Sequence, residues 1–151
     1  MFDGEITPIR VFSNANRFIE AYHAVLQPLC RESGLPPMAV DILMFAANNP
    51  DYATARNICQ YRGMKPSIVS VHVERLVSEG YLERQNVPGD RRQTLLVCTE
   101  KAQPMVEQGR ALQKRFSERL TMGLSDADKE ALHKAMTLLD NNIEEIRKNG
   151  L

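Results

Sequence analysis

The chain has 151 residues, of which 43% are hydrophobic and 25% are charged, and this is the composition of an ordinary globular domain. This length suits one compact domain with helical extensions and disfavours two independent cores. The net charge is zero, so binding to a charged polymer would have to come from the distribution of charge. No apolar run approaches the ~20 residues of a membrane span, and the first ten residues do not have the basic-then-apolar order of a secretion signal. We therefore expect a cytoplasmic protein without a membrane partner.

Residues that carry chemistry are few. The three cysteines are Cys30, Cys59 and Cys98. They are odd in number, widely spaced and form no C-x-x-C pair, which argues against a disulfide framework or a local zinc site. The histidines are scattered, and the sequence contains no glycine-rich phosphate loop and no nucleophile elbow. The sequence predicts no catalytic residues, no metal site and no cofactor.

The first half of the chain predicts helices. Apolar residues recur at helical spacing from about residue 7 to residue 33, and Pro28 should kink or end this first helix. Two prolines open a second helix that runs from about residue 36 to residue 48. Thr54 can cap a third, short helix that ends at about Arg62. These three helices form the predicted N-terminal half.

A fourth helix begins at Pro66 and ends at Gly80. Four apolar residues at helical spacing form its inward face. They are Val69, Val73, Leu76 and Val77. The opposite face has the same period and carries Ser67, Ser70, Val71 and Glu74. This second face is mostly polar and would not be buried in a core. It therefore indicates a functional surface on the helix.

After Gly80 the pattern predicts a hairpin. Residues 81–86 and 93–98 have the composition of strands, and residues 87–92 form a connecting turn with Pro-Gly chemistry. The fourth helix and the hairpin that follows it, with its basic turn, form one structural unit.

The rest of the chain is again helical. An apolar stripe resumes after Thr99, where Pro104 should distort the first turn. Ser125 and Asp128 have the spacing of a capping box and begin a last helix that extends to the C-terminus. The first and last segments carry long apolar stripes that a small core cannot wholly cover. Pairing with a second copy of the chain would bury them, although packing within one chain is an alternative.

Basic residues gather in the middle of the chain. Residues 54–99 contain seven basic and four acidic side chains, a balance of +3, whereas residues 1–53 contain three basic and six acidic ones, a balance of −3. A basic middle between acidic and neutral arms is typical of phosphate binding, although a count this small also fits ordinary surface variation.

Several linked stretches between Ile58 and Ala102 carry a family resemblance. Met64–Leu76 looks like a recognition helix, Glu79–Arg84 like its exit and the first wing strand, Gly89–Arg92 like an Asp-x-Arg wing tip, and Leu95–Ala102 like the second strand and the start of the next helix. Together these motifs, at these separations, resemble the MarR family of winged-helix regulators.

The resemblance implies a mainly α (α+β) fold, a winged helix-turn-helix with N- and C-terminal dimerisation helices. Residues 1–151 would form a single domain of this type, in which residues 36–99 are the DNA-binding lobe and residues 1–34 and 100–151 are the dimerisation region. The implied function is that of a sequence-specific transcription regulator, a homodimeric repressor that binds a palindromic double-stranded operator and is released by a small ligand.

The recognition helix would lie in the major groove, where base edges present distinct donors, acceptors and thymine methyls. Ser67 and Ser70 are short enough to approach bases or phosphates. Val71 stands where the family often has arginine or another polar residue, and it either contacts a thymine methyl or is buried against the wing or the preceding helix. Lys65 stands where the family often has a capping serine or threonine, so a DNA phosphate would help satisfy the free amides there.

The hairpin tip would enter the minor groove through Arg91 and Arg92. The resemblance makes Arg92 the wing arginine, with Asp90 or Glu74 holding its orientation. His72 is either a half-buried packing residue or a phosphate donor. The predicted DNA-contacting residues are Lys65, Pro66, Ser67, Ser70, Val71, Glu74, Arg75, Asp90, Arg91 and Arg92.

The resemblance also implies a small lipophilic or aromatic ligand bound between the dimer arms and the DNA lobes. Candidate lining residues, which fit a core equally well, are Phe18, Tyr22, Leu26, Met38, Ile42, Met105 and Phe116. Two other functions remain open. One is a winged-helix adaptor that binds another protein through the same helix, and the other is a regulator that senses oxidants through one of its cysteines.

Overall fold

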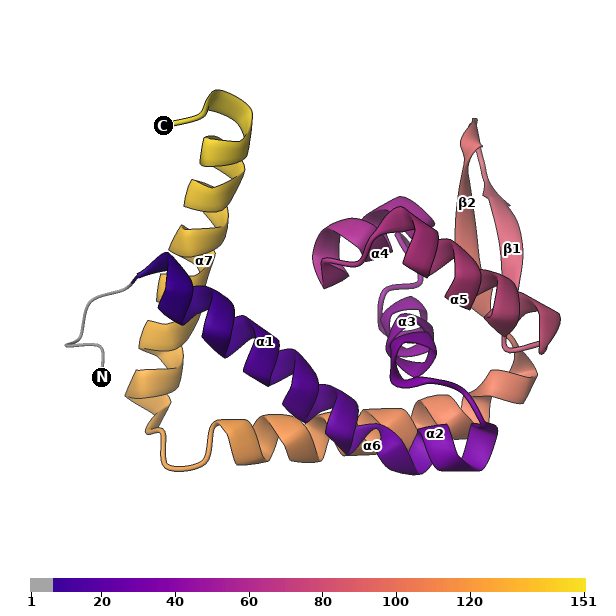
Figure 1. Ribbon diagram of the computed structural model, residues 1–151, viewed down its shortest axis with the longest axis horizontal. Coiled ribbons are helices and arrows are strands. Elements are labelled where there is room, and N and C mark those ends of the chain that lie inside the picture. The colour runs from indigo at the N-terminus through magenta and orange to yellow at the C-terminus, as the bar shows by residue number, and fades with distance from the viewer. Residues whose placement is uncertain (1–6) are drawn as a thin grey trace. The chain divides into compact units, whose positions relative to one another are not determined.

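The computed structural model describes residues 7–151 of the chain. The chain divides into two compact units, of which the first ends at Lys114 and the second is Arg115–Leu151. The elements in chain order are α1 (Pro8–Val25), α2 (Gln27–Ser33), α3 (Pro37–Asn48), α4 (Ala55–Arg62), α5 (Pro66–Ser78), β1 (Leu82–Val87), β2 (Asp90–Cys98), the short 3-10 turn η1 (Glu100–Ala102), α6 (Gln103–Leu120) and α7 (Asp126–Asn149) (Figure 1).

The predicted first helix is two helices. α1 ends at Val25, and Pro28 occupies the first turn of α2, where a residue without an amide hydrogen costs nothing. Gly34 then ends α2 with a φ of 72°, a conformation that glycine adopts without strain. The expected break at Pro28 is therefore confirmed, and it takes the form of a new helix start.

Helix α3 is the centre of the first unit. Val40, Ile42, Leu43 and Met44 on consecutive turns of α3 are fully buried, because α5 and β2 pack on one side of the helix and α1 and α2 on another. The inward face of α5 was predicted correctly at Val69, Val73 and Leu76, which are buried, while the fourth predicted residue, Val77, is half-buried. The result is a core that holds α5 in place by one face and leaves its other face outward.

The hairpin differs from its prediction. Strand β1 has the expected length but is shifted by one residue, β2 begins three residues earlier than expected, and Pro88 and Gly89 alone connect them, so the predicted six-residue turn is wrong. Gly89 has a φ of 83°, which fits the second central position of a tight Pro-Gly turn. Arg91 and Arg92 consequently belong to β2.

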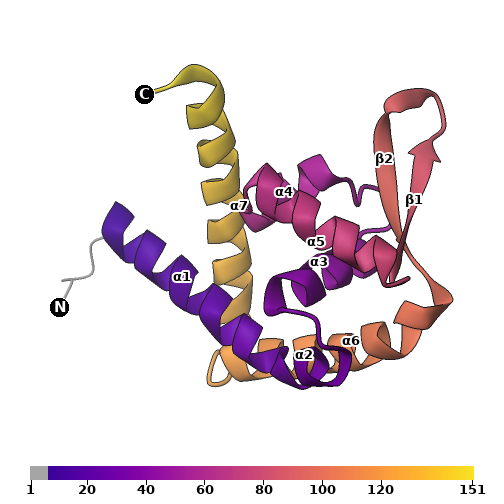
Figure 2. The ribbon, with the colours of Figure 1, turned by 45° about the vertical axis from the view of Figure 1, so that its right-hand side comes forward.

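The pairing of the two strands is irregular near this turn. Asn86 faces Thr94 while Val87 faces Asp90, so Arg91–Gln93 form an extra loop of strand that faces no residue of β1. At the base of the hairpin, Leu96 donates its amide to the Ala53 carbonyl at 2.8 Å and joins the hairpin to the start of α4. Figure 2 shows the hairpin extending beyond α4 and α5.

The second unit contains the end of α6 and all of α7. Ser125 and Asp128 form the predicted capping box, with Asp128 N donating to Ser125 Oγ at 3.1 Å. The hydrogen bond from the Ser125 hydroxyl, and then that from its amide, lowers the pKa of Asp128. No residue of α7 is buried, and its apolar stripe is exposed at Leu132, Met136, Leu139, Ile143 and Ile146. Among residues 7–151 no helix is both long and apolar enough to cross a membrane.

Candidate nucleic-acid interface

The outer face of α5 presents the residues that the sequence singled out. Ser67, Ser70, Val71 and Glu74 are all exposed, while the inward residues of the same helix are buried. Val71 is 65% exposed, so it is not packed against the wing or against α4. Its place on this face leaves a branched apolar group free to contact a partner.

The start of α5 is also open. Lys65 occupies the cap position without a side-chain hydrogen bond to the helix, and Pro66 follows at the first helical position. The Lys65 carbonyl accepts from the Ile68 amide at 3.0 Å, but neither side chain caps the helix, so this end of α5 keeps the partial positive charge that attracts anions. The departure of Lys65 from the family pattern therefore leaves a cationic side chain beside a free helix start.

The structure separates the arginines that have partners from those that do not. Arg62 donates to Asp41 at 2.8 Å, Arg75 to Glu79 at 2.7 Å, and Arg84 to Glu74 at 2.8 Å. Arg75 also donates to the Gly34 carbonyl at 2.8 Å, which fastens α5 to the end of α2. These three arginines have structural partners.

Four cations of the basic segment have no ion pair within the part of the chain that the structure describes. They are Arg56, Lys65, Arg91 and Arg92. The expectation that Asp90 or Glu74 would hold the Arg92 guanidinium is wrong. Glu74 is bound to Arg84, which reaches it from β1, and Asp90 accepts a hydrogen bond from the backbone amide of Arg92 at 2.9 Å. Asp90 thus shapes the strand and leaves the Arg92 side chain available.

His72 lies on the side of α5 and is half-buried. Burial, and to a smaller extent the nearby Arg75, lowers the pKa of His72. Its Nδ1 is buried without a hydrogen-bond partner among residues 7–151. The lowered pKa favours the neutral imidazole, so His72 offers a phosphate less positive charge than an ordinary histidine would.

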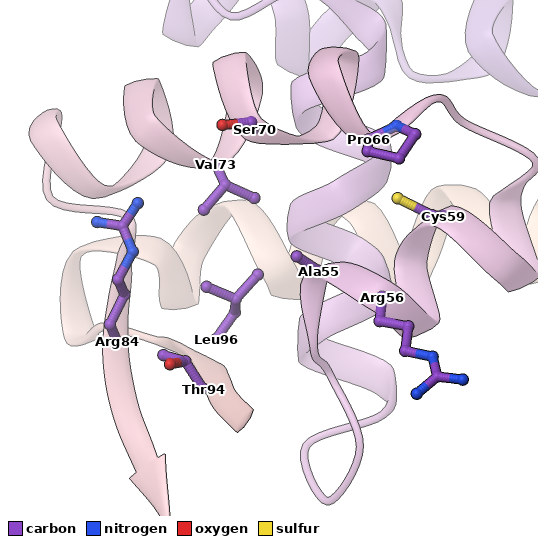
Figure 3. Close-up of a pocket in the computed structure, with 9 residues that line it drawn as sticks. All are labelled: Ala55, Arg56, Cys59, Pro66, Ser70, Val73, Arg84, Thr94 and Leu96. Carbon is purple, nitrogen blue, oxygen red and sulfur yellow. The ribbon is translucent and has the colours of Figure 1, made fainter. Parts of the chain in front are cut away.

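Two cavities flank the hairpin. One has a volume of about 410 Å³ and lies between α4, α5 and the strands. Its walls are mostly apolar, and Figure 3 shows Arg84 at one side and Arg56 at the other. The second, about 680 Å³, lies between the start of α4 and the outer part of β2, with Arg56 and Arg92 among its lining residues. Arg56 therefore borders both cavities.

The predicted ligand-lining residues are not gathered in one described cavity. Tyr22, Leu26 and Ile42 are buried in the core, Phe18 and Met38 are exposed, and Phe116 is half-buried. Met105 lines a third cavity, about 230 Å³, together with residues of α2 and α6. The ligand site at these seven residues stays a prediction.

The sequence pattern singled out Pro66 and Ser70 as DNA contacts, but it did not predict the 410 Å³ cavity that they help to line. Ala55 and Cys59 of α4 are far in the chain from Leu96, and they meet it because β2 pairs beside the start of α4. The one available signal was the presence of Arg56 and Arg84 in the basic segment, and that signal did not distinguish phosphate contacts from ion pairs. A cavity between three elements has no local sequence pattern.

Two of the cysteines have environments that suppress reactivity. Burial raises the pKa of the Cys98 thiol to about 11, and burial also raises the pKa of Cys30. The thiolate is the reactive form. Cys59 is half-buried and lines the 410 Å³ cavity.

We expect Cys98 to be alkylated slowly by iodoacetamide. With a pKa of about 11, roughly one Cys98 thiol in a thousand is ionised at pH 8, so its rate should rise about tenfold per pH unit up to pH 10. Peptide mass spectrometry of the native protein after timed labelling measures this rate, with urea-unfolded protein as the control. A rate for Cys98 in the native protein equal to that in the unfolded protein would contradict the buried environment.

The sequence and the fold of this chain are similar to those of known proteins. A family model described as the MarR family matches residues 33–93, which run from the end of α2 to the irregular part of β2. Among solved structures, the chain is similar to a putative MarR family transcriptional regulator from Listeria monocytogenes complexed with a 26mer DNA, with 14% identity over 97% of both chains and a TM-score of 0.76. It is also similar to a MarR transcriptional regulator from Methanosarcina mazei, with 16% identity over 95% of this chain and 96% of that one and a TM-score of 0.73.

A third similar structure is CouR from Rhodococcus jostii bound to p-coumaroyl-CoA, with 20% identity, a TM-score of 0.67, and 85% of this chain and 87% of that one covered. At such identities these likenesses establish the fold, and the family model adds the sequence match over the helix-turn-helix and wing. The chain therefore has a MarR-family winged helix-turn-helix at residues 33–93 within the fold of the MarR regulators, and the resemblance predicted from its sequence is confirmed.

Proposed function

We propose that this chain is a sequence-specific DNA-binding transcription regulator that works as a homodimer, with the domain organisation expected from its sequence. One observation carries the proposal. The exposed polar face of α5 and the cations without ion pairs, Lys65 at the start of α5 and Arg91 and Arg92 in the wing, belong to one winged helix-turn-helix. A helix of this kind suits the major groove, and an extended arginine suits the narrow minor groove.

The homodimer is supported by the exposed apolar residues of the first and last helices. Ile9 and Phe12 of α1 and the stripe of α7 lie in water in a single chain. Exposing so many large apolar groups is costly, and a second copy would bury them symmetrically. A two-fold dimer presents two recognition helices about 34 Å apart and requires a palindromic site.

Selection from a random-sequence duplex pool, followed by anisotropy measurements on the selected duplex, tests this function. We expect a palindrome, two chains per duplex and a strong decrease of affinity with salt, because each neutralised phosphate contributes about −0.9 to the slope of log K against log salt. Failure to select any palindrome, together with salt-independent binding, would contradict the proposal and would favour the protein-binding adaptor.

The proposal includes repression and release by a small ligand. The similar CouR structure contains an acyl-CoA ligand. In this chain the 410 Å³ cavity directly beneath α5 is the described space best suited to a small amphipathic molecule, because its walls are apolar and two arginines border it. A molecule there would displace α5 or compete with DNA for Arg56.

Val71 supplies a prediction about the sequence that is read. If Val71 contacts a thymine methyl, replacing that thymine by deoxyuridine should weaken binding about fourfold per half-site, the value of one buried methyl. Scanning each thymine of the selected operator with deoxyuridine, with the parent and with Val71→Ala, measures the effect. The sensitive position should be absent with Val71→Ala, and an operator with no sensitive position in the parent would exclude this contact.

A further inference from the structure

A buried ionic cluster connects helix α1 with the helix-turn-helix. Asp41 of α3 is only 3% exposed, and its Oδ2 accepts a hydrogen bond from Arg62 Nη2 at 2.8 Å. The same oxygen lies 3.1 Å from His23 Nε2, which must donate because an ionised carboxylate can only accept. His23 belongs to α1 and Arg62 is the last residue of α4. One carboxylate oxygen therefore joins three helices.

Tyr22 extends this cluster on the α1 side. The Arg62 guanidinium lies over the Tyr22 ring, with Cζ 5.7 Å from the ring centre. The Tyr22 hydroxyl accepts a hydrogen bond from Gln113 Nε2 of α6 at 2.6 Å. Burial is the main cause that raises the pKa of Tyr22, so the phenol is neutral at physiological pH. Arg62 is thus linked to α1 in two ways. It contacts the Tyr22 ring directly, and it shares the Asp41 carboxylate with His23.

The position of Arg62 in the chain gives the cluster its importance. Gly63 follows with a φ of 63°, and α5 begins at Pro66, so only three residues separate Arg62 from the proposed recognition helix. A connection of three residues restricts the orientation of α5 relative to the end of α4. Fixing Arg62 therefore fixes the start of α5.

The cluster is a poor device for stability alone. Asp41 is buried and its partners Arg62 and His23 are half-buried, so the pairing carries a desolvation cost, and an apolar set of similar volume is often as stable or more so. Arg62 Nε is moreover buried without a hydrogen-bond partner within residues 7–151. Buried ionic groups of this kind are best known for fixing one arrangement among several.

We propose that Asp41, by accepting from both His23 and Arg62, positions the recognition helix α5 relative to α1 and thereby sets the half-site spacing that the dimer accepts. This inference rests on the proposed function, since it takes α1 to lie at the dimer interface. His23, Asp41 and Arg62 are positioning residues, because none of them reaches the exposed face of α5.

The spacing between the two half-sites of the operator is the property that the Asp41 cluster would control. Adding one base pair between half-sites moves the second site by about 3.4 Å and rotates it by about 34°. A dimer with a rigid angle between α1 and α5 cannot follow this change, whereas a dimer with a loose angle can. Loss of the connection should therefore broaden the accepted spacing and leave the base preference unchanged.

Two substitutions of His23 separate this role from stability. His23→Leu removes the donor from α1 while the Asp41–Arg62 pair stays intact, so no buried charge is left alone. His23→Gln is the matched control, because its side-chain amide can again donate to Asp41 Oδ2. The single substitution Asp41→Ala is unsuitable, since it would leave Arg62 as an unpaired buried charge and would threaten folding.

The measurement is anisotropy titration of the full chain with the selected operator and with versions that have one base pair inserted or removed between half-sites. We expect the parent and His23→Gln to lose at least about fivefold in affinity on either altered duplex, and His23→Leu to lose less than about twofold. If His23→Leu does not fold, the double substitution Asp41→Leu/Arg62→Leu, which leaves no charge without its partner, carries the same expectation.

Equal spacing preference in the parent and His23→Leu would overturn the inference, as would a parent that binds all three spacings equally. In both cases the parent still binds a palindrome, so the proposed function stands. A parent that selects no palindrome at all would overturn the proposed function and this inference together. The two failures are therefore distinguishable.

Discussion

Replacing Arg92 by alanine should weaken operator binding by about 1–3 kcal/mol, which is a fivefold to 150-fold increase in Kd. Arg92 lies in the irregular part of β2, where no residue of β1 faces it and no carboxylate among residues 7–151 pairs with its guanidinium. An unpaired guanidinium on a projecting hairpin breaks no ion pair when it enters the minor groove, so only the loss of its hydration and side-chain freedom opposes the contact. Fluorescence anisotropy at fixed salt measures the change in Kd.

Arg31→Ala is the matched control for this substitution. Arg31 is exposed on α2 and its removal changes the net charge by the same amount, so any general electrostatic effect appears in both variants. We expect the Kd of Arg31→Ala to lie within about twofold of the parent. Equal Kd values for Arg92→Ala and the parent would remove Arg92 from the interface.

Replacing Gly109 by leucine should lower the free energy of unfolding by about 1–3 kcal/mol. Gly109 is buried in α6, and a Cβ there would overlap Met44 Sδ and lie 2.8 Å from Met44 Cε and 3.4 Å from Leu29 Cδ1. Met44 belongs to the fully buried face of α3, which has little room to move. The overlap outweighs the gain of about 0.8–1.0 kcal/mol that leucine brings to a helix interior over glycine. Urea unfolding followed by circular dichroism measures the loss.

Ala111→Leu tests whether the effect belongs to packing. Ala111 lies in the same helix two residues later, and it is exposed. We expect this variant to unfold within about 0.5 kcal/mol of the parent. A similar loss in both variants would show that leucine perturbs α6 generally, and the close approach of α6 to α3 would then not be the cause.

Helix boundaries were predictable where local residues determine them. Thr54 accepts a hydrogen bond from Asn57 N at 3.2 Å and starts α4, and Ser125 and Asp128 start α7 as their spacing indicated. Pro66 begins α5 for an equally local reason, because its missing amide is not needed at the first helical position. Each of these signals needs only a few neighbouring residues.

The wing was predicted in kind but not in length. Local composition indicated two strands and a Pro-Gly turn, yet the irregular pairing near Asn86 and Val87 depends on contacts between strands. Arg91 and Arg92 look like turn residues in the sequence because they are polar and follow the Pro-Gly pair closely. Their place in β2 comes from the two-residue connection, which the sequence pattern alone did not distinguish from a longer loop.

The roles of the arginines depended on tertiary contacts. Arg62 pairs with Asp41, which is 21 residues away, and Arg84 pairs with Glu74, which is 10 residues away. No spacing rule predicts such pairs, so the sequence could not sort structural arginines from free ones. Arg75 is the exception, because its partner Glu79 stands four residues later on the same helix turn, where ion pairs are expected.

Hydroxyl-radical footprinting of the selected operator tests the central claim most directly. We expect two protected half-sites related by a dyad and centred one helical turn apart, about 10–10.5 base pairs, each with a protected minor groove where the wing carries Arg91 and Arg92. A single unsymmetrical footprint, or no protection at concentrations that saturate anisotropy, would contradict a dimer that reads DNA with two copies of α5.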